Sequence, residues 1–417
     1  MEASNKWGGA MAFFKRTIRD VPVDRKTVLV RADYNVPLNK KGEISDDLRI
    51  RASLPTLEYL LKHNCKVVVM SHLGRPEGKD KSLSLEPIAA RLSELLGREV
   101  IFVDDCIGDK VAQAVKKAPA NAIILLENLR YYTQEEANDE KFAEKIAKAT
   151  GARYFVQDGF GVVHRAHAST DAITHFIPGV SGLLLEREYV TITSAMEHPK
   201  RPLVAVMGGA KVSDKITVIE RLVHVADRVV IGGAMANTFL KYKGYHVGAS
   251  KVEEGQEKVL DGIYSAAHEK SEGHADDFIM LPADVAVAKD ISETEKRRNV
   301  GLHEVAEDDK ILDIGEKAIG NIVDALQGAK TVIWNGTLGY AELPEFAHGS
   351  ARLALELASH SEITSIIGGG DTADFVLKWD GNGGESFTHV STGGGASLEL
   401  MAGEKLPGVE SLLDASR

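Results

Sequence analysis

Short apolar runs alternate with amphipathic stretches along this chain. In its first part the apolar runs occupy 28–30, 67–70, 100–103, 123–126 and 154–156, and helical periodicity fills 50–63, 86–96, 109–117 and 140–150. Apolar strands that alternate with amphipathic helices are typical of a parallel sheet covered by helices. The first part of the chain therefore predicts an α/β domain with a mostly parallel sheet.

The same alternation resumes further along the chain. Apolar runs at 203–207, 228–231, 278–281, 331–334 and 363–367 predict a second set of strands. Because 417 residues exceed what one hydrophobic core usually serves, we expect two doubly wound, Rossmann-like domains.

The stretch 183–198 contains neither glycine nor proline and is followed by Pro199 and Pro202. This pattern predicts a helix that joins the two domains, with a hinge close to it. The expected domains are 11–185 and 186–403. Residues 1–10 are short of apolar residues and precede Met11-Ala-Phe-Phe-Lys, which reads like a second start, so we expect them to be an added extension outside the fold.

Composition excludes several classes of protein. The chain has 50 Lys and Arg against 61 Asp and Glu, and its net charge of −11 argues against general binding to nucleic acid or anionic membranes. Cys65 and Cys106 form no CxxC pair, which favours reduced thiols over a disulfide framework or a zinc site. No apolar run approaches the roughly 18 residues of a membrane helix, and no signal-peptide pattern opens the chain. We expect a cytoplasmic protein, and a monomer.

Basic side chains follow the predicted strands of the first domain. Arginine is permanently charged and offers planar paired donors that match phosphate and carboxylate oxygens. In open α/β sheets, ligands bind beyond the carboxyl ends of the strands. A lone arginine is more often a solvated surface charge, but the repetition after three strands favours an anion site. The candidates are Arg49, Arg75, Arg130 and Arg165, with His72 and His167 as additional donors.

Some of these residues have a second interpretation. Arg49 opens a predicted helix, where its charge opposes the macrodipole, and a functional role would explain that placement. Asp33 and Asn35 either bind a substrate hydroxyl or carboxylate or cap the turn at Pro37. The histidines at 72, 164 and 167 suggest a metal site, which is disfavoured because the nearby arginines would repel a cation.

Glycine-rich turns follow the strands of the second domain, at 208–209, 232–233, 368–370 and 393–395. Bare backbone at the start of a helix binds phosphates well. The turn after 203–207 lacks the spacing of a P-loop. The turn is followed by a predicted helix, and Lys211 and Lys215, at i and i+4, are expected to share one helical face. Lys215 would then reach a transferring phosphoryl group, and an ordinary amphipathic helix start is the alternative. Asp371 is either a ligand for Mg²⁺ or a helix N-cap.

These motifs, in this order, resemble those of the phosphoglycerate kinase family from about Phe13 to the end of the chain. The matching segments are RADYNVP at 31–37, SHLGRP at 71–76, ENLR at 127–130, HRAH at 164–167, GAKV at 209–212, GGGDT at 368–372 and STGGGA at 391–396.

The resemblance implies that the first domain binds 3-phosphoglycerate or 1,3-bisphosphoglycerate and that residues 404–417 pack back onto it. The implied acid-binding residues are Asp33, Asn35, Arg49, His72, Arg75, Arg130, Arg165 and His167. It also implies that the second domain binds ADP or ATP with Mg²⁺, the metal lying on Asp371. The implied nucleotide-binding residues are Gly209, Lys211, Lys215, Gly233, Asn335, Glu342, Gly368, Gly369, Gly370, Asp371, Thr372, Gly393, Gly394 and Gly395.

The expected reaction is direct in-line phosphoryl transfer after domain closure, with Arg49 and Lys215 as the catalytic residues. Two alternatives stay open at this point. A non-enzymatic nucleotide sensor would keep the fold but lose transfer, against which the presence of Arg49, Lys215 and Asp371 argues. A Rossmann dehydrogenase is disfavoured because no GxGxxG motif with an acidic residue about 20 positions later opens the chain.

Overall fold

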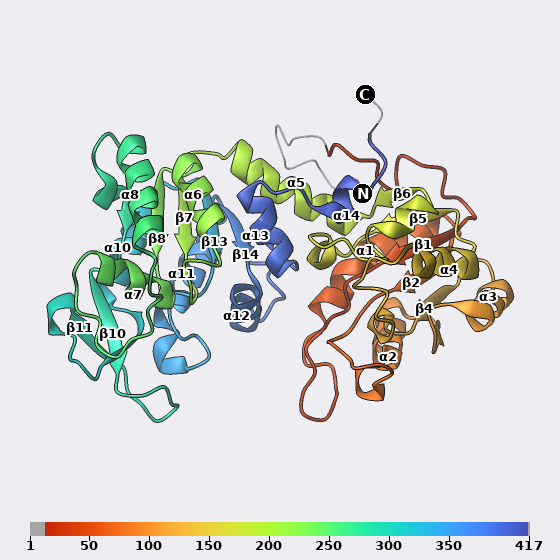
Figure 1. Ribbon diagram of the computed structural model, residues 1–417, viewed down its shortest axis with the longest axis horizontal. Coiled ribbons are helices and arrows are strands. Elements are labelled where there is room, and N and C mark those ends of the chain that lie inside the picture. The colour runs from red at the N-terminus through yellow and green to blue at the C-terminus, as the bar shows by residue number, and fades with distance from the viewer. Residues whose placement is uncertain (1–12, 416–417) are drawn as a thin grey trace. The chain divides into compact units, whose positions relative to one another are not determined.

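The computed structural model describes residues 13–415, and the extension expected at 1–10 lies outside the described residues. The chain divides into two compact units (Figure 1). Unit 1 runs to Val190 and includes the segment from Glu404 onward, and unit 2 is Thr191–Gly403. The division falls within helix α5 (Leu183–Glu197), at 190/191 rather than at the expected 185/186. In the described part of the chain, no helix has the length and apolar character needed to cross a membrane.

Unit 1 is built on a six-stranded sheet in the order β3-β4-β2-β1-β5-β6, and every strand pair in it is parallel. This confirms the mostly parallel α/β sheet predicted from the apolar runs. The strands are β1 (Thr27–Arg31), β2 (Lys66–Met70), β3 (Val100–Val103), β4 (Ile123–Leu126), β5 (Tyr154–Gln157) and β6 (Gly179–Ser181). The helices are α1 (Leu48–Lys62), α2 (Glu86–Leu96), α3 (Gly108–Lys117) and α4 (Glu140–Thr150).

The C-terminal segment packs on unit 1. It includes the short helix α14 (Pro407–Glu410), where the Gly408 amide donates to the Val163 carbonyl at 2.9 Å. The Leu413 amide donates to Gly179 O at 2.9 Å, and the Lys15 ammonium lies 2.7 Å from the Asp414 carboxylate. These contacts tie both ends of the described chain to the same unit.

Unit 2 holds a second parallel sheet, in the order β15-β14-β13-β7-β8-β9. Its strands are β7 (Leu203–Met207), β8 (Arg228–Ile231), β9 (Ile279–Met280), β13 (Thr331–Asn335), β14 (Thr364–Gly368) and β15 (His389–Val390). Its helices are α6 (Ile216–Val225), α7 (Gly233–Tyr242), α8 (Glu257–Lys270), α9 (Ala275–Phe278), α10 (Glu316–Leu326), α11 (His348–Ser359), α12 (Gly370–Asp380) and α13 (Gly394–Ala402).

A three-stranded antiparallel sheet, β11-β10-β12, is a further part of unit 2 that the sequence pattern did not predict. It comprises β10 (Asp284–Ala288), β11 (Arg298–Gly301) and β12 (Lys310–Ile314). The expected strand at 278–281 is only two residues long, because Phe278 ends helix α9.

Both parallel sheets have a topological switch point, where successive strands begin to be added on the opposite side of the first strand. In unit 1 the strands β2 and β5 flank β1, and in unit 2 the strands β8 and β13 flank β7. The loops that leave such a point diverge, so ligands in open α/β sheets bind at the carboxyl ends of these strands. Each unit therefore has one edge at which its site residues are expected.

Candidate active site

Most of the predicted site residues of unit 1 follow the carboxyl ends of its strands. Asp33 and Asn35 follow β1, His72 and Arg75 follow β2, Arg130 follows β4, and the segment 164–167 follows β5. Arg49 is the exception, as predicted, because it is the second residue of helix α1. The sheet thus brings residues from four loops and one helix to the same edge.

Arg49 and Asp33 form an ion pair, in which Arg49 Nη1 lies 2.9 Å from Asp33 Oδ2. The Asp33 carboxylate is buried, and the Arg49 side chain is 28% exposed. Burial alone would raise the pKa of Asp33, but the charges of its neighbours, Arg49 first and Arg31 also, outweigh burial and hold the pKa below its usual value. Asp33 therefore stays ionised and orients Arg49 through this ion pair.

Asp33 and Asn35 also organise the loops around them. Asp33 Oδ1 accepts from the Asn35 amide at 3.2 Å, which is the local turn contact that the sequence allowed. Asn35 Oδ1 accepts from the Gly74 amide at 2.8 Å and so joins the loop after β1 to the loop after β2.

Arg130 is largely buried, with a side chain that is 9% exposed, and it lies close enough to Arg75 and Arg165 to feel their charges. Its Nη1 donates to Gly74 O at 2.8 Å and its Nη2 lies 3.2 Å from Glu136 Oε1, whereas its buried Nε has no hydrogen-bond partner among the described residues. Burial lowers the pKa of Arg130, and the charges of Arg165 and Arg75 lower it further. Arginines this close repel one another, so a bound anion would stabilise the group.

The three histidines at this edge are neutral at physiological pH. Burial lowers the pKa of His72 well below its usual value, and Arg31 adds to the effect. Burial, followed by Arg31 and Arg130, lowers the pKa of His167 to about 4. Burial and Arg165 lower the pKa of His164. Neutral imidazoles beside arginines can donate to an anion, and the described residues include no cluster of three or more His, Cys, Asp or Glu suited to a metal ion.

Arg31 takes part in this edge although sequence reasoning did not make it a site residue. It is the last residue of β1 and is almost completely buried. It donates to Ser169 Oγ at 2.7 Å and to His72 Nδ1 at 3.1 Å, and it lies 4.0 Å from the buried Glu135 carboxylate. The sequence does contain one indication of this role: Arg31 ends an otherwise apolar strand, and an arginine that is buried there requires a hydrogen-bond or ion-pair partner.

Glycines line the corresponding edge of unit 2, where their backbones pack closely. A Cβ atom on Gly336 would lie 2.2 Å from Gly208 O, and one on Gly233 would lie 2.6 Å from Gly209 N. Gly336 also has a φ of +95°, which disfavours other residues. The loops after β7, β8 and β13 therefore form one tight cradle of backbone.

Lys215 lies in this cradle, but not on the helix predicted for it. Helix α6 begins at Ile216 with Lys215 as its N-cap, and residues 212–215 form a turn. The Glu253 carboxylate accepts from the amides of Val212 (2.8 Å) and Ser213 (3.1 Å) and so holds the turn. The prediction that Lys211 and Lys215 share one helical face is therefore wrong.

The Lys215 ammonium donates to Gly208 O at 2.8 Å and to Asn335 O at 3.3 Å. Burial lowers its pKa from 10.5 to about 8, although Asp371 and Asp214 oppose the shift. A Cβ on Gly336 would lie 2.6 Å from Lys215 Nζ, and the Gly336 amide donates to Thr372, so the loop after β14 lies near this lysine.

Two helix N-termini meet beside the cradle. Gly369, with a φ of +93°, is the N-cap of α12, and a Cβ on Gly394, the first residue of α13, would lie 3.3 Å from Gly370 N. Gly393 and Gly395 flank Gly394 in the same turn. Helix N-termini present free N–H groups and a positive dipole end, which together bind phosphate.

Asn335, Asp371 and Thr372 have different environments at this point. Thr372 Oγ1 accepts from the Gly336 amide at 2.7 Å and so joins two of the loops. Asn335 is buried, and its Nδ2 has no partner among the described residues. Asp371 is exposed in the first turn of α12, and Gly369 rather than Asp371 is the N-cap.

Lys211 and Glu342 are exposed. Within the part of the chain that the structure describes, neither forms a hydrogen bond or ion pair with the cradle. The other predicted residues of unit 2 are brought to one edge; these are Gly209, Lys215, Gly233, Asn335, Gly368, Gly369, Gly370, Asp371, Thr372, Gly393, Gly394 and Gly395.

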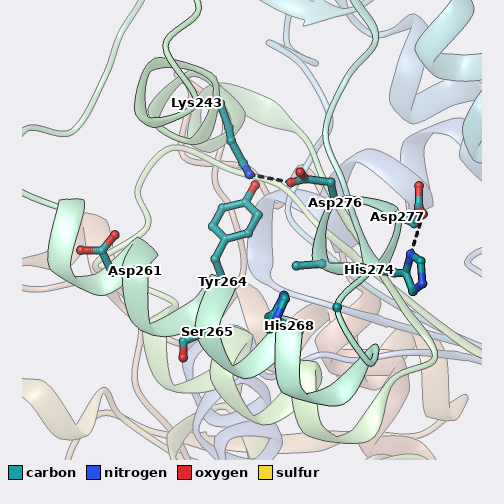
Figure 2. Close-up of a pocket in the computed structure, with 10 residues that line it drawn as sticks. Lys243, Asp261, Tyr264, Ser265, His268, His274, Asp276 and Asp277 are labelled. Carbon is teal, nitrogen blue, oxygen red and sulfur yellow. Dashed lines mark hydrogen bonds and ion pairs between the residues drawn. The ribbon is translucent and has the colours of Figure 1, made fainter.

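A hollow of about 510 Å³ lies elsewhere in unit 2, between α7, α8 and α9 (Figure 2). Several of its polar groups have partners: the Lys243 ammonium contacts the Asp276 carboxylate at 2.5 Å and lies 3.9 Å from the centre of the Tyr264 ring, and His274 lies 3.8 Å from Asp277. None of the residues that line it is a predicted site residue.

Comparison with known proteins agrees with this geometry. A family model described as phosphoglycerate kinase matches residues 18–404. The phosphoglycerate kinase of Dictyoglomus turgidum is 45% identical over 96% of this chain and 99% of its own length, and the chloroplastic phosphoglycerate kinase of Volvox carteri is 46% identical over 95% and 86%. The solved structure of phosphoglycerate kinase from Coxiella burnetii has a TM-score of 0.82 at 34% identity and covers 95% of this chain and 98% of its own. The chain belongs to the phosphoglycerate kinase family.

Proposed function

We propose that this protein transfers a phosphoryl group reversibly between 1,3-bisphosphoglycerate and ADP, giving 3-phosphoglycerate and ATP in glycolysis and gluconeogenesis. The observation that carries the proposal is the pairing of two chemically different anion sites in one chain of this family. Unit 1 presents side-chain cations at its sheet edge, and unit 2 presents helix N-termini and one partly buried lysine.

The phosphorylated acid is assigned to unit 1. Arg75, Arg130 and Arg165 act as permanent cations toward its phosphate and carboxylate oxygens, and His72 and His167 act as neutral donors. Arg49, oriented by Asp33, is assigned to the transferring phosphoryl group. Its charge lies beside the acid site, and its side chain is partly exposed rather than enclosed in a buried hydrogen-bond network.

The nucleotide is assigned to unit 2. The adjoining N-termini of α12 and α13 offer backbone donors for its phosphates, and the glycines after β7, β8 and β13 allow the backbone to approach them closely. Lys215 is assigned to the transferring phosphoryl group from this side. Glu342, expected on the ribose, and Lys211, expected on the phosphates, are proposed to reach the nucleotide from their exposed positions.

The donor set at α12 fits Mg²⁺ held together with nucleotide phosphates. Mg²⁺ in kinases is usually bound through one or two carboxylates, with phosphate oxygens and water as the other ligands. The Asp371 carboxylate is exposed and makes no hydrogen bond or ion pair with the described residues, and it lies where the helix N-terminus would hold phosphate. When bound, the metal would neutralise phosphate charge. We assign Asp371 as its protein ligand.

The transfer needs no general base, because the attacking oxygen of ADP or of the acid is already ionised. The protein then has to position the two substrates in line and to neutralise the charge on the transferring oxygens. Arg49 and Lys215 supply that charge. We propose that closure of the two units about a hinge near α5 brings the substrates together.

A coupled assay for ATP formation from 1,3-bisphosphoglycerate and Mg-ADP tests the proposal directly. Arg49→Ala is expected to lower kcat by roughly 10³, by analogy with other arginines that stabilise phosphoryl transfer. The matched control is Arg51→Ala, which removes an exposed arginine of the same helix whose partner is Asp47. A wild-type protein without activity, or an Arg49→Ala variant with near-normal kcat, would contradict the proposal.

Three finer assignments have tests of their own. Asp371→Asn should raise the Mg²⁺ concentration needed for half-maximal rate, and a Mg²⁺ titration measures this. The proposed monomer predicts a single species near the chain's mass of 45.1 kDa in light scattering. The proposed cytoplasmic location, which rests on composition, is checked by fractionating cells that express the protein.

A further inference from the structure

Arg31 is held on several sides in the interior of unit 1. Its Nε donates to Ser169 Oγ at 2.7 Å, one terminal nitrogen donates to Ala32 O, and the other donates to His72 Nδ1 at 3.1 Å. Glu135 lies behind this group; it accepts from the Ser169 amide at 3.1 Å and from the Ser169 hydroxyl. Arg31 and Glu135 are both essentially excluded from solvent.

This arrangement fixes where the proton of His72 lies. A guanidinium has five N–H donors and no acceptor, so a hydrogen bond from Arg31 to Nδ1 requires Nδ1 to be the acceptor. In a neutral imidazole the proton is then on Nε2. The opposite tautomer would place the Nδ1 hydrogen against the Arg31 donor.

We propose that Arg31 is a positioning residue that locks His72 in its neutral Nε2–H tautomer, so that His72 offers the phosphorylated acid a donor and never a lone pair. The tautomer decides whether His72 attracts or repels an anion, because an Nδ1–H imidazole would present the Nε2 lone pair to the anion and repel it. The binding role rests on the proposed function, whereas the tautomer is a property of the free protein.

The charges that face His72 favour the same state. Burial disfavours the charged form of His72, Arg31, Arg130 and Arg49 oppose its protonation further, and Asp33 favours it. The Glu135 carboxylate compensates the charge of Arg31 and holds Ser169, so the guanidinium cannot turn away from the ring without losing its other partners.

Nitrogen NMR of the wild-type protein labelled with ¹⁵N-histidine tests the proposal. The ligand-free protein is used, and the His72 signals are identified by their absence from the spectrum of His72→Gln. We expect a pyridine-like Nδ1 and a pyrrole-like Nε2 that do not change between pH 5.5 and 8. An Nδ1–H tautomer, a mixture, or a ring that titrates in this range would overturn the proposal.

Arg31→Lys tests the cause, because one ammonium cannot serve Ser169, Ala32 and His72 together. We expect His72 to populate both tautomers and the KM for 3-phosphoglycerate to rise by roughly tenfold, the effect of one hydrogen bond to a charged group, with the KM for ATP unchanged. An unchanged tautomer in a folded Arg31→Lys variant would remove Arg31 from the role. If this variant does not fold, the wild-type spectrum still decides.

A second pair of variants separates the donor from mere packing. The side-chain nitrogen of glutamine corresponds in position to imidazole Nε2, and that of asparagine corresponds to Nδ1. His72→Gln should therefore retain a lower KM for 3-phosphoglycerate than His72→Asn, and the reverse order would count against the Nε2 donor. A protein with the expected spectrum but no phosphoryl transfer would refute the proposed function and leave the tautomer standing.

Discussion

Lys215→Met is expected to make the protein less active and more stable at neutral pH. The ammonium is partly buried at the carboxyl end of β7, where its hydrogen-bond acceptors are the carbonyls of Gly208 and Asn335. A charge held in such a place favours transfer but destabilises the folded chain, because burial disfavours the charged form. Methionine has a similar length and no charge, so it removes both the charge that favours phosphoryl transfer and the cost of burying that charge.

The size of the effect follows from the pKa of Lys215, which burial lowers from 10.5 to about 8. At pH 7 that difference corresponds to about 3 kcal/mol of destabilisation, at about 1.4 kcal/mol for each pH unit. Losing the hydrogen bond to Gly208 O offsets about 1 kcal/mol of the gain. We therefore expect Lys215→Met to raise the free energy of unfolding by about 2 kcal/mol at pH 7.

The gain should disappear in alkali. Between pH 8 and 10.5 the unfolded chain keeps the Lys215 proton while the folded chain loses it, so wild-type stability rises with pH relative to the variant. By pH 9.5, about 1.5 pH units above the pKa of the folded chain, the free energy of unfolding of the wild type has risen by about 2 kcal/mol, so the two proteins should be equally stable.

Urea unfolding followed by tryptophan fluorescence measures this in unit 2 alone, where Trp334 and Trp379 lie in β13 and α12. Trp7 lies outside the described residues and is replaced by phenylalanine in every protein compared. Lys211→Met is the matched control, since that lysine is exposed and its loss should change stability little at either pH. A Lys215→Met variant that is less stable than wild type at pH 7, or a stability difference that is the same at pH 9.5, would contradict this expectation. The kcat of Lys215→Met should fall by roughly 10² to 10³.

Three further substitutions have expected outcomes. Gly336→Ala forces a Cβ to within 2.2 Å of Gly208 O at a φ of +95°; it should cost at least about 2 kcal/mol of stability and weaken ADP binding in calorimetry, with 3-phosphoglycerate affinity retained. Glu135→Gln leaves Arg31 without its counter-charge, a loss of about 3 kcal/mol that should outweigh the relief of removing a carboxylate whose pKa burial raises; scanning calorimetry should show a net destabilisation. Burial raises the pKa of Asp158 from 3.8 to about 7, so wild-type stability falls as pH rises through that range. Asp158→Asn should therefore gain stability over wild type between pH 4 and pH 8. Urea unfolding at both pH values measures this, and a stability difference that is the same at both would contradict it.

The elements with local signals were predictable from sequence. Helices α2 and α4 have the expected bounds of 86–96 and 140–150, because a left-handed glycine follows each helix, at Gly97 and Gly151. Asp139 also caps α4 by accepting from the Phe142 amide at 2.7 Å. The antiparallel sheet lacks such signals: β11 is short, polar and exposed, and it exists through its ladder with β10 rather than through its own residues.

The same contrast between local and distant causes holds at the candidate site. That Arg75, Arg130 and Arg165 follow strands is visible in the sequence, and the topology then brings them to one edge. The turn before Lys215 was not predictable, because it depends on Glu253, which is 41 residues from Val212. The role of Arg31 depends on Ser169, which is 138 residues away, so no window of local sequence contains it.

The two half-sites respond differently to pH, and the reason lies in how each obtains its positive charge. In unit 1 the charge belongs to arginines, which stay ionised, while burial keeps the neighbouring imidazoles of His72 and His167 neutral. In unit 2 the backbone dipoles of α12 and α13 do not titrate, and the one amine in the cradle has a pKa of about 8. Moderate alkali therefore leaves the charge of the acid site unchanged but removes the charge of Lys215 in the free protein. Bound phosphate raises the pKa of that lysine and so restores its charge.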